Sequence, residues 1–301
     1  MSDYVSQNGV ETVFNTENSW TILSPVEQQI KTKIESIGTP LKNWNVRIYR
    51  GILTGYNEAF IISGEKKAEL IAQDPKSAEI IRPILRGRDV KRYNFEFADL
   101  WIISTFPSRN YDIDNYPAVK QYLLEIGIHR LEQTGKEYTI NGETVKARKK
   151  TTNKWFETQD SISYWEDFSK QKIFWGELSD EPKFTIDEGE YYLANTIFFM
   201  TGESLKYLLA FLNSKLSKYF FSTIGTTSGM GTTRWLKYKI ETFFVPKLSV
   251  NEERDVIELV DSVLRCKQDG KDSTEYEQKI NNLIYEIYGF TEEEIKLIEM
   301  Y

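Results

Sequence analysis

The chain of 301 residues has one cysteine, Cys266, and one histidine, His129. A lone cysteine cannot form a disulfide within the chain, and such usage is typical of a reducing cytoplasm. A lone histidine excludes the usual structural zinc sites, which need four Cys or His ligands, and leaves little room for a Ser-His-Asp triad. His129 fits a surface or partly buried position better than a catalytic base. We therefore expect a cytoplasmic, metal-free protein.

Long apolar runs and familiar catalytic motifs are also missing. No run approaches the roughly 18 residues that span a bilayer, and residues 1–4 lack the basic and apolar regions of a signal peptide. The glycines between Gly225 and Gly231 are not followed by Gly-Lys-Ser/Thr, and no Gly-x-Ser-x-Gly elbow occurs. Metal-dependent nucleases often use an acidic residue two positions before a lysine. This spacing occurs here about as often as chance predicts for a chain that is 28% charged, so it indicates no active site. We expect no membrane contact, no catalytic residues and no cofactor in this chain.

Charge is present but strongly separated. The net charge is −7, yet residues 204–240 hold six basic residues and no acidic one. The last 51 residues hold 14 acidic and 6 basic residues. A local basic segment indicates an anionic partner even in an acidic protein. Arg234 and Lys237 are its candidate contacts, although such segments can also be solvated faces.

A second basic cluster lies in residues 82–93. Arginine offers a planar fork of donors that fits a phosphate or the guanine major-groove edge. Gly87 would let a backbone N–H approach a phosphate closely. The alternative is a solvated turn held by one structural Arg–Asp pair. The candidate DNA contacts here are Arg82, Arg86, Arg88, Lys91 and Arg92.

A third basic cluster directly precedes Trp155 and Phe156. Lysines in a polar loop near aromatic side chains suit phosphate contact with stacking nearby. An exposed hairpin tip followed by a core strand explains each single residue equally well. The candidate DNA contacts are Arg148, Lys149, Lys150 and Lys154.

Local patterns predict an α+β fold. Ser24 before Pro25 begins a helix that Gly38 ends, and residues 205–220 carry one apolar helical stripe. Ser or Thr three residues before Glu predicts further helix starts at Ser249, Thr274 and Thr291. The strands are expected within residues 45–50, 59–63, 99–105, 172–175 and 191–200.

Three regions follow from these patterns. We expect a flexible segment at 1–19 and a β-rich domain with inserted loops and helices at 20–248. An acidic helical region with a helical hairpin should occupy 249–301. The Gly/Thr/Ser-rich loop 222–233 is either a flexible connector or a segment that orders on DNA.

Several segments together resemble the TaqI-like C-terminal specificity domain of type IIG restriction–modification enzymes and adenine-specific DNA methyltransferases. Residues 50–62, with Gly51, Thr54, Gly55 and Asn57, look like its glycine/asparagine entry segment. Residues 81–93 are similar to its next recurrent block. Residues 205–216 resemble a helix shared with type I specificity subunits. Two closing segments, 244–246 and 284–295, complete the ordered set.

The resemblance implies a module that recognises double-stranded DNA. The Asn-Pro-Pro-Tyr-type catalytic motif and the glycine-rich cofactor motif of those enzymes do not occur here. The resemblance therefore assigns S-adenosylmethionine, and possibly magnesium, to a methyltransferase or nuclease domain of a parent protein. That domain would flip an adenine while this module holds the duplex. Two alternatives remain: a protein-interaction scaffold that uses the acidic helices, and a standalone nuclease.

Overall fold

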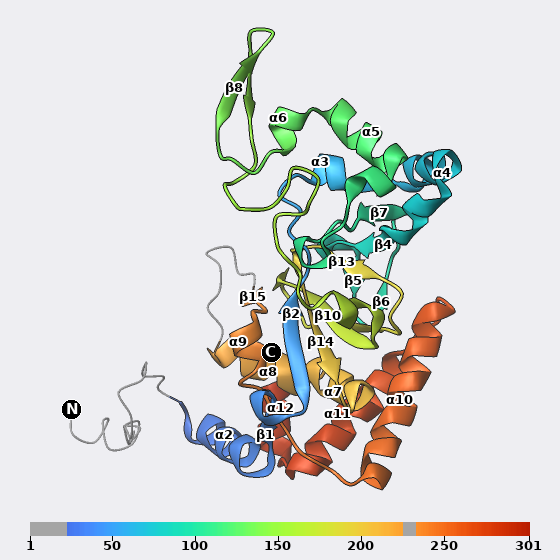
Figure 1. Ribbon diagram of the computed structural model, residues 1–301. Helices are drawn as coiled ribbons and strands as arrows, with labels where there is room; N and C mark the ends of the chain where they lie inside the picture. Colours follow the sequence, from blue (N-terminus) through green and yellow to red (C-terminus); the bar gives the residue numbers. More distant parts are fainter. Residues whose placement is uncertain (1–22, 225–232) are drawn as a thin grey trace, which may run out of the picture. The chain divides into compact units, whose positions relative to one another are not determined.

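The structure, a computed structural model, describes residues 23–224 and 233–301 (Figure 1). The expected flexible segment 1–19 lies outside the described residues. So does most of the loop expected at 222–233, although its first residues end helix α8 and its last begins strand β15. The described residues form two compact units. The helical unit contains residues 23–44, 206–224 and 238–301, and the sheet unit contains 45–205 and 233–237.

Two four-stranded sheets form the centre of the sheet unit. The first has the order β12-β10-β14-β2, and all its neighbours are antiparallel. The second has the order β13-β4-β7-β3, in which only β13 and β4 are parallel. The strands are β2 (Val46–Arg50), β3 (Ile61–Ser63), β4 (Ile81–Leu85), β7 (Leu100–Ile103), β10 (Lys172–Gly176), β12 (Phe184–Asp187), β13 (Tyr192–Leu193) and β14 (Ile197–Gly202).

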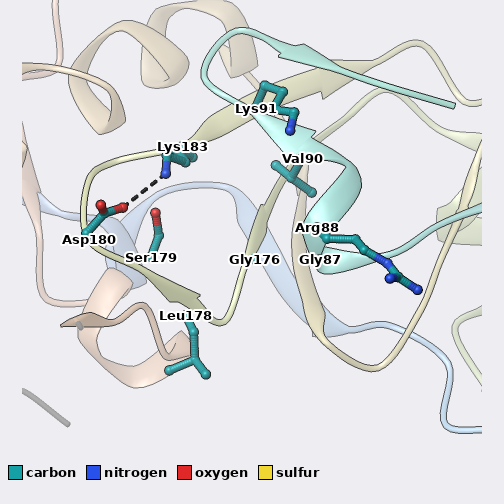
Figure 2. A pocket seen from close by; sticks show the side chains of 9 residues that line it. All are labelled: Gly87, Arg88, Val90, Lys91, Gly176, Leu178, Ser179, Asp180 and Lys183. Carbon is teal, nitrogen blue, oxygen red and sulfur yellow. Dashed lines mark hydrogen bonds and ion pairs between the residues drawn. The ribbon is translucent and has the colours of Figure 1, made fainter. Parts of the chain in front are cut away.

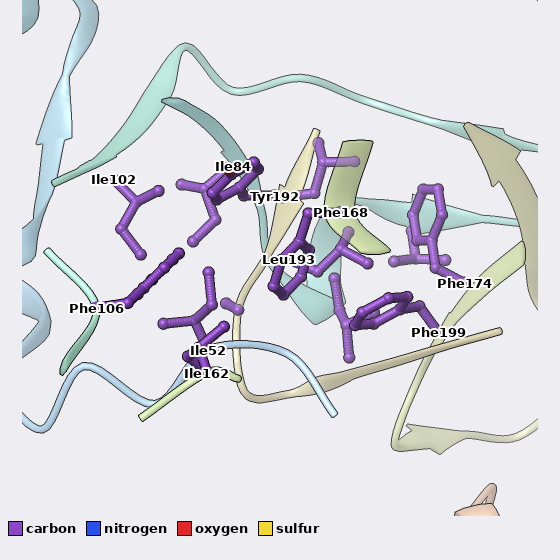
Figure 3. Packing of buried hydrophobic residues seen from close by; sticks show 14 residues of the cluster. Ile52, Ile84, Ile102, Phe106, Ile162, Phe168, Phe174, Tyr192, Leu193 and Phe199 are labelled. Atoms are coloured by element: carbon purple, nitrogen blue, oxygen red, sulfur yellow. The ribbon is translucent and has the colours of Figure 1, made fainter. Parts of the chain in front are cut away.

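Two apolar clusters hold the sheet unit together. One joins the sheets, because it combines Ile102 of β7 with Phe174 and Phe199 of the first sheet (Figure 3). The other packs the opposite side of β7, where Ile103 meets Leu123 of helix α5. Consecutive strand residues point to opposite faces, so adjacent isoleucines of β7 serve different clusters.

Short helices and hairpins connect these strands. The α-helices are α3 (Asn57–Phe60), α4 (Gly64–Gln73), α5 (Pro117–Ile126) and α6 (Ile128–Leu131). The 3-10 turns are η2 (Pro75–Glu79), η3 (Gly87–Asp89), η4 (Pro107–Arg109), η5 (Ile113–Asn115) and η6 (Trp165–Ser169). The remaining strand pairs are β5 (Val90–Lys91) with β6 (Asn94–Phe95), β8 (Glu137–Ile140) with β9 (Glu143–Lys146), and β11 (Leu178–Ser179) with β15 (Thr233–Arg234).

The helical unit gathers segments from both ends of the chain. Ion pairs join Lys33 of α2 to Glu294 of α12 at 2.6 Å and Lys206 of α7 to Asp261 of α10 at 2.7 Å. Its elements are α2 (Pro25–Ile37), β1 (Thr39–Pro40), η1 (Leu41–Asn43), α7 (Leu205–Leu212), α8 (Lys215–Ile224), α9 (Lys237–Ile240), β16 (Phe244–Val245), α10 (Val250–Gln268), α11 (Thr274–Tyr288) and α12 (Glu292–Glu299). The mixture of helices and open sheets, with the α10–α11 hairpin near the C-terminus, confirms the α+β prediction.

The domain division differs from the expected boundary at 248/249. Residues 206–224 and 238–248 pack with the C-terminal helices, as when Tyr288 donates a hydrogen bond of 2.7 Å to the Phe244 carbonyl. The predicted stripe at 205–220 is also two helices, because the chain breaks at Asn213 and Ser214 between α7 and α8. Tertiary contacts decide such groupings, and a one-dimensional pattern does not contain them.

Three of the four predicted helix starts carry complete capping boxes. In each box, the hydroxyl of the cap residue accepts a hydrogen bond from the N–H of the glutamate three residues later. The carboxylate of that glutamate accepts a hydrogen bond from the N–H of the cap residue. The three caps are Ser24, Ser249 and Thr291. The start at Thr274 is corrected, because Ser273 is the N-cap there and makes no capping bond. None of the helices in the described ranges is both long and apolar enough to cross a bilayer.

Candidate nucleic-acid interface

The second basic cluster centres on the η3 turn, which an arginine–aspartate pair closes. The Arg86 guanidinium donates to both carboxylate oxygens of Asp89, at 3.0 and 2.8 Å, and the Arg86 N–H adds a bond of 2.8 Å. Burial raises the pKa of the Asp89 carboxyl, but the Arg86 hydrogen bonds outweigh it, and the pKa lies below its ordinary value. Arg86 therefore has its charge compensated within the turn, as the structural alternative predicted.

The neighbouring cations of this cluster are differently placed. Arg88 is exposed, and within the described ranges no hydrogen bond or ion pair engages its guanidinium. Lys91 is exposed and lies 3.7 Å from Glu96. Arg92 packs over the Tyr93 ring in the β5–β6 turn, with 5.2 Å from its guanidinium carbon to the ring centroid. Arg88 and Lys91 are thus the most accessible charges of this cluster.

Two adjacent hollows open beside η3. One has a volume of about 420 Å³ and the other about 600 Å³, and both are lined by Gly87, Arg88 and Leu178. Figure 2 shows Arg88 extending from the turn, while Lys183 pairs with Asp180 on another wall at 3.0 Å. The Gly87 N–H donates to Thr196 Oγ1 at 3.0 Å, so this donor is already used.

Strand pairing brings a distant basic residue to the same place. Arg234 of β15 lies directly opposite Leu178 of β11 in an antiparallel pair. Leu178 is 56% exposed and lines both hollows. The side chain of Arg234 is exposed, as is that of Lys237, the last residue of the sheet unit.

The basic segment 204–240 is divided by the fold. Arg234 and Lys237 belong to the sheet unit, whereas its four other basic residues belong to the helical unit. Lys206 is paired with Asp261, and Lys239 is only 5% exposed. Lys206 and Lys239 are therefore poorly suited to contact a polyanion, the first because its charge is compensated and the second because it is buried.

The predicted entry loop is a tightly packed turn before α3. Gly51 approaches the chain so closely that a Cβ would lie 2.2 Å from the Ala194 carbonyl oxygen, and Gly55 has a φ of +80°. Thr54 Oγ1 accepts from the Tyr56 N–H at 3.2 Å and donates to Asn57 Oδ1 at 2.7 Å. Glycine tolerates both the close approach and the positive φ, and the threonine holds the asparagine in place.

Arg148, a predicted DNA contact, instead has a structural position. Its side chain is only 4% exposed, and burial lowers its pKa to about 10, which leaves it charged at neutral pH. Its guanidinium donates to the carbonyls of Leu131, Thr54, Glu157 and Trp155 at 2.7–2.8 Å. Every arm of the guanidinium is engaged with the backbone, so we leave Arg148 out of the proposed interface.

The lysines that follow Arg148 are on the surface. Lys149, Lys150 and Lys154 are all exposed. Burial raises the pKa of the Asp160 carboxyl, and the nearby charges of Arg50 and Lys149 oppose that rise. The Asp160 carboxylate is therefore attracted by both Lys149 of the third cluster and Arg50.

Arg50 and Arg82 each donate a side-chain hydrogen bond to a backbone carbonyl. Arg50 donates to the Asn195 carbonyl at 2.8 Å and pairs with Glu177 at 2.9 Å, and both acceptor residues line the larger hollow. Pattern reasoning missed Arg50 as a site residue because it stands alone at a strand end. Arg82 is half-buried on β4 and donates to the Ala78 carbonyl at 2.8 Å.

Metal-binding geometry is absent from the parts of the chain that the structure describes. Within them, no three Cys, His, Asp or Glu side chains gather closely enough to hold an ion. His129 is half exposed and contacts the Tyr138 ring at a tilt of 37°, with 4.5 Å between ring centroids.

Two solved structures share this fold. The first, the type IIL restriction-modification enzyme MmeI in complex with DNA, aligns over 85% of this chain with a TM-score of 0.59 and 12% identity. The second, the type IIG restriction endonuclease BpuSI, aligns over 87% with a TM-score of 0.51 and 15% identity. This chain spans about a third of each protein, 34% and 32%.

The sequence itself matches a family model over residues 82–245, which begins at the arginine cluster and ends at β16. The family of this model is the TaqI-like C-terminal specificity domain. The match confirms the resemblance that the sequence motifs indicated. Because it covers more than half of the 301 residues, the chain belongs to the TaqI-like C-terminal specificity domain family.

Proposed function

We propose that this chain is the module that recognises a specific double-stranded DNA sequence for a restriction–modification or phage-defence DNA methyltransferase. It would work in the cytoplasm and hold the duplex for adenine methylation or cleavage by catalytic domains of the parent protein. S-adenosylmethionine, and magnesium where cleavage occurs, would bind to those domains. Family membership and the restriction–modification enzymes of similar fold support this proposal.

The observation that carries the proposal is the convergence of exposed cations in the sheet unit. Arg88 and Lys91 come from the η3 region, and Arg234 reaches Leu178 at the same hollow through strand pairing. Basic residues far apart in the sequence are thus brought close to the same hollows, which a single run of solvated charges would not explain. We name this surface, with Arg88, Lys91, Lys183 and Arg234, the hollow rim.

The chemistry of the rim suits a polyanion. Cations that neutralise phosphates release condensed counterions, so binding weakens steeply as salt rises. Phosphate contacts fix register without reading sequence, whereas groups in the hollows are placed to meet base edges. Lys149, Lys150 and Lys154 would extend the phosphate contacts along the duplex.

Fluorescence anisotropy with a mixed pool of duplex DNA, at several salt concentrations, tests the proposal. We expect binding with a log–log salt slope of several units. The double variant Arg88→Ala/Lys91→Ala should weaken binding and lower the slope by about 1–2. The control Lys271→Ala/Lys279→Ala removes the same charge from the acidic hairpin and should change binding little. A folded chain that binds no DNA at low salt would overturn the proposal and favour the scaffold alternative.

A second assay addresses the nuclease alternative. Purified chain incubated with supercoiled plasmid and magnesium should leave the plasmid intact. Linear or nicked products that scale with chain concentration would contradict the assignment of cleavage to another domain.

A further inference from the structure

Two asparagine side chains line the larger hollow from different segments of the sheet unit. Asn57 begins helix α3, and Asn195 lies in the turn between β13 and β14. Arg88 lines the same hollow from η3. Two asparagines and one exposed arginine therefore line a single space of about 600 Å³.

The backbone of Asn195 is held on both sides, while its side chain is not. Its N–H donates to the Ile52 carbonyl at 3.0 Å, and its carbonyl accepts from Arg50 Nε at 2.8 Å. Among the residues that the structure describes, its carboxamide has no hydrogen-bond partner. The fixed backbone holds this unused carboxamide at the larger hollow, where it is available to a ligand.

Asn57 is oriented rather than free. Thr54 Oγ1 already accepts from the Tyr56 N–H, so its own hydrogen goes to Asn57 Oδ1 at 2.7 Å. This bond sets which end of the carboxamide faces Thr54 and leaves the amide nitrogen as a donor. No partner engages that nitrogen within residues 23–224 and 233–301.

The two carboxamides differ in kind from the charged side chains around them. A neutral carboxamide releases no counterion, so it adds little to non-specific affinity. It does match the N6 donor and N7 acceptor of adenine in the major groove, as arginine matches O6 and N7 of guanine. Arg86 beside them is unsuited to this task because Asp89 occupies its guanidinium.

We propose that Asn57 and Asn195 read adenine edges, and that Arg88 reads a guanine edge, where the larger hollow meets the major groove. This inference rests on the proposed function and deepens it, because it separates base readers from phosphate contacts. The exposed Leu178 on the same wall would offer an apolar contact for a thymine methyl group.

Selection from a randomised duplex pool, with wild type and Asn195→Ala in parallel, tests the inference. The wild type should return a defined sequence. Asn195→Ala should lose the adenine preference at one position and bind the best site about 5- to 150-fold more weakly. Its salt slope should equal that of the wild type. The melting temperature should also be unchanged, since the side chain has no partner to lose.

Two further variants sharpen the result. Asn57→Asp keeps an oxygen that accepts from Thr54 but replaces the amide donor with a charged oxygen. It should change the base preference at a second position of the selected sequence, in addition to a uniform loss of affinity from the repulsion between its charge and the phosphates. Asn115→Ala, in the η5 turn and outside both hollows, is the matched control and should return the wild-type sequence. If Asn195→Ala fails to fold, Asn195→Ser, which also removes the carboxamide and adds no charge, gives the same comparison.

The outcomes separate this inference from the proposed function. A wild-type chain that binds DNA with no sequence preference, or not at all, would overturn the proposed function itself. A selective wild type with an unchanged preference in Asn195→Ala and Asn57→Asp would overturn only the inference. Uniform weakening of Asn195→Ala for all sequences, with a reduced salt slope, would overturn it too, because it would mark a phosphate contact.

Discussion

Arg148 donates a hydrogen bond of 2.8 Å to the carbonyl of Thr54, which lies 94 residues earlier in the chain. Three further carbonyls share the same buried guanidinium. The bond ties the loop that carries the third basic cluster to the entry loop that carries Asn57. One arginine therefore positions two of the segments that we assign to the interface.

Removing this anchor should destabilise the fold. Arg148→Ala leaves the carbonyls of Leu131 and Trp155 without a donor, and each such group costs about 1–3 kcal/mol. The carbonyls of Thr54 and Glu157 keep a second donor, the Gln159 N–H at 3.2 Å and Gln133 Nε2 at 3.1 Å. We expect the free energy of unfolding to fall by about 2 kcal/mol or more, measured by urea denaturation. Arg148→Lys should recover only part of it, because one ammonium cannot replace a planar fork. Lys149→Ala, the adjacent exposed control, should change stability by less than about 0.5 kcal/mol.

The exposed lysines should affect binding without affecting stability. Lys149→Ala/Lys150→Ala removes two candidate phosphate contacts, which should lower the salt slope of DNA binding by about 1.8. The sequence preference should stay the same, because phosphate contacts carry no sequence information. Anisotropy titrations over a range of salt measure the slope. An unchanged slope would remove this cluster from the interface.

The Arg86–Asp89 pair predicts a pH dependence of stability. The pKa of Asp89 lies below its ordinary value of 3.8, so the pair stabilises the fold above that value. Its contribution is lost as pH falls through the folded-state pKa. The difference in melting temperature between wild type and Asp89→Asn should be largest near neutral pH and shrink below about pH 4. A difference that stays constant down to pH 2 would contradict the charge-based account.

The corrected helix start predicts unequal effects of two similar substitutions. Ser249 caps α10 in a complete box, so Ser249→Ala should cost about 1 kcal/mol of stability. Thr274 is exposed and bonds only to Asp272, so Thr274→Ala should cost less than about 0.5 kcal/mol. Thermal unfolding followed by circular dichroism compares them. Equal losses of stability in the two variants would indicate that Thr274 caps its helix as Ser249 does.

Much of the local structure was predictable, since its causes are local. The boxes at Ser24, Ser249 and Thr291 involve residues only three apart, and each begins a helix as expected. Strands formed in each predicted run, although Ala59 belongs to a short helix and residues 191–200 contain two strands. Helix breaks such as the one at Ser214 were missed, because the apolar stripe continues across it.

The candidate site was predictable only in part. The sequence placed Arg86, Arg88 and Arg148 in the same class, as arginines within basic clusters. The structure separates them: one closes a turn, one is accessible at a hollow, and one is buried among carbonyls. Asn195 and Arg50 were missed because neither belongs to a basic cluster.

The sequence by itself determined the α+β class, the positions of most helices and strands, and the family, because caps, periodicity and ordered motifs are properties of neighbouring residues. Only the tertiary structure decided how the segments group into units and which charges face solvent. Those features depend on contacts between residues far apart in the chain, such as Arg148 with Thr54 and Arg234 beside Leu178. Identical side chains acquire different roles because burial and partners, rather than residue type, set what each guanidinium can bind.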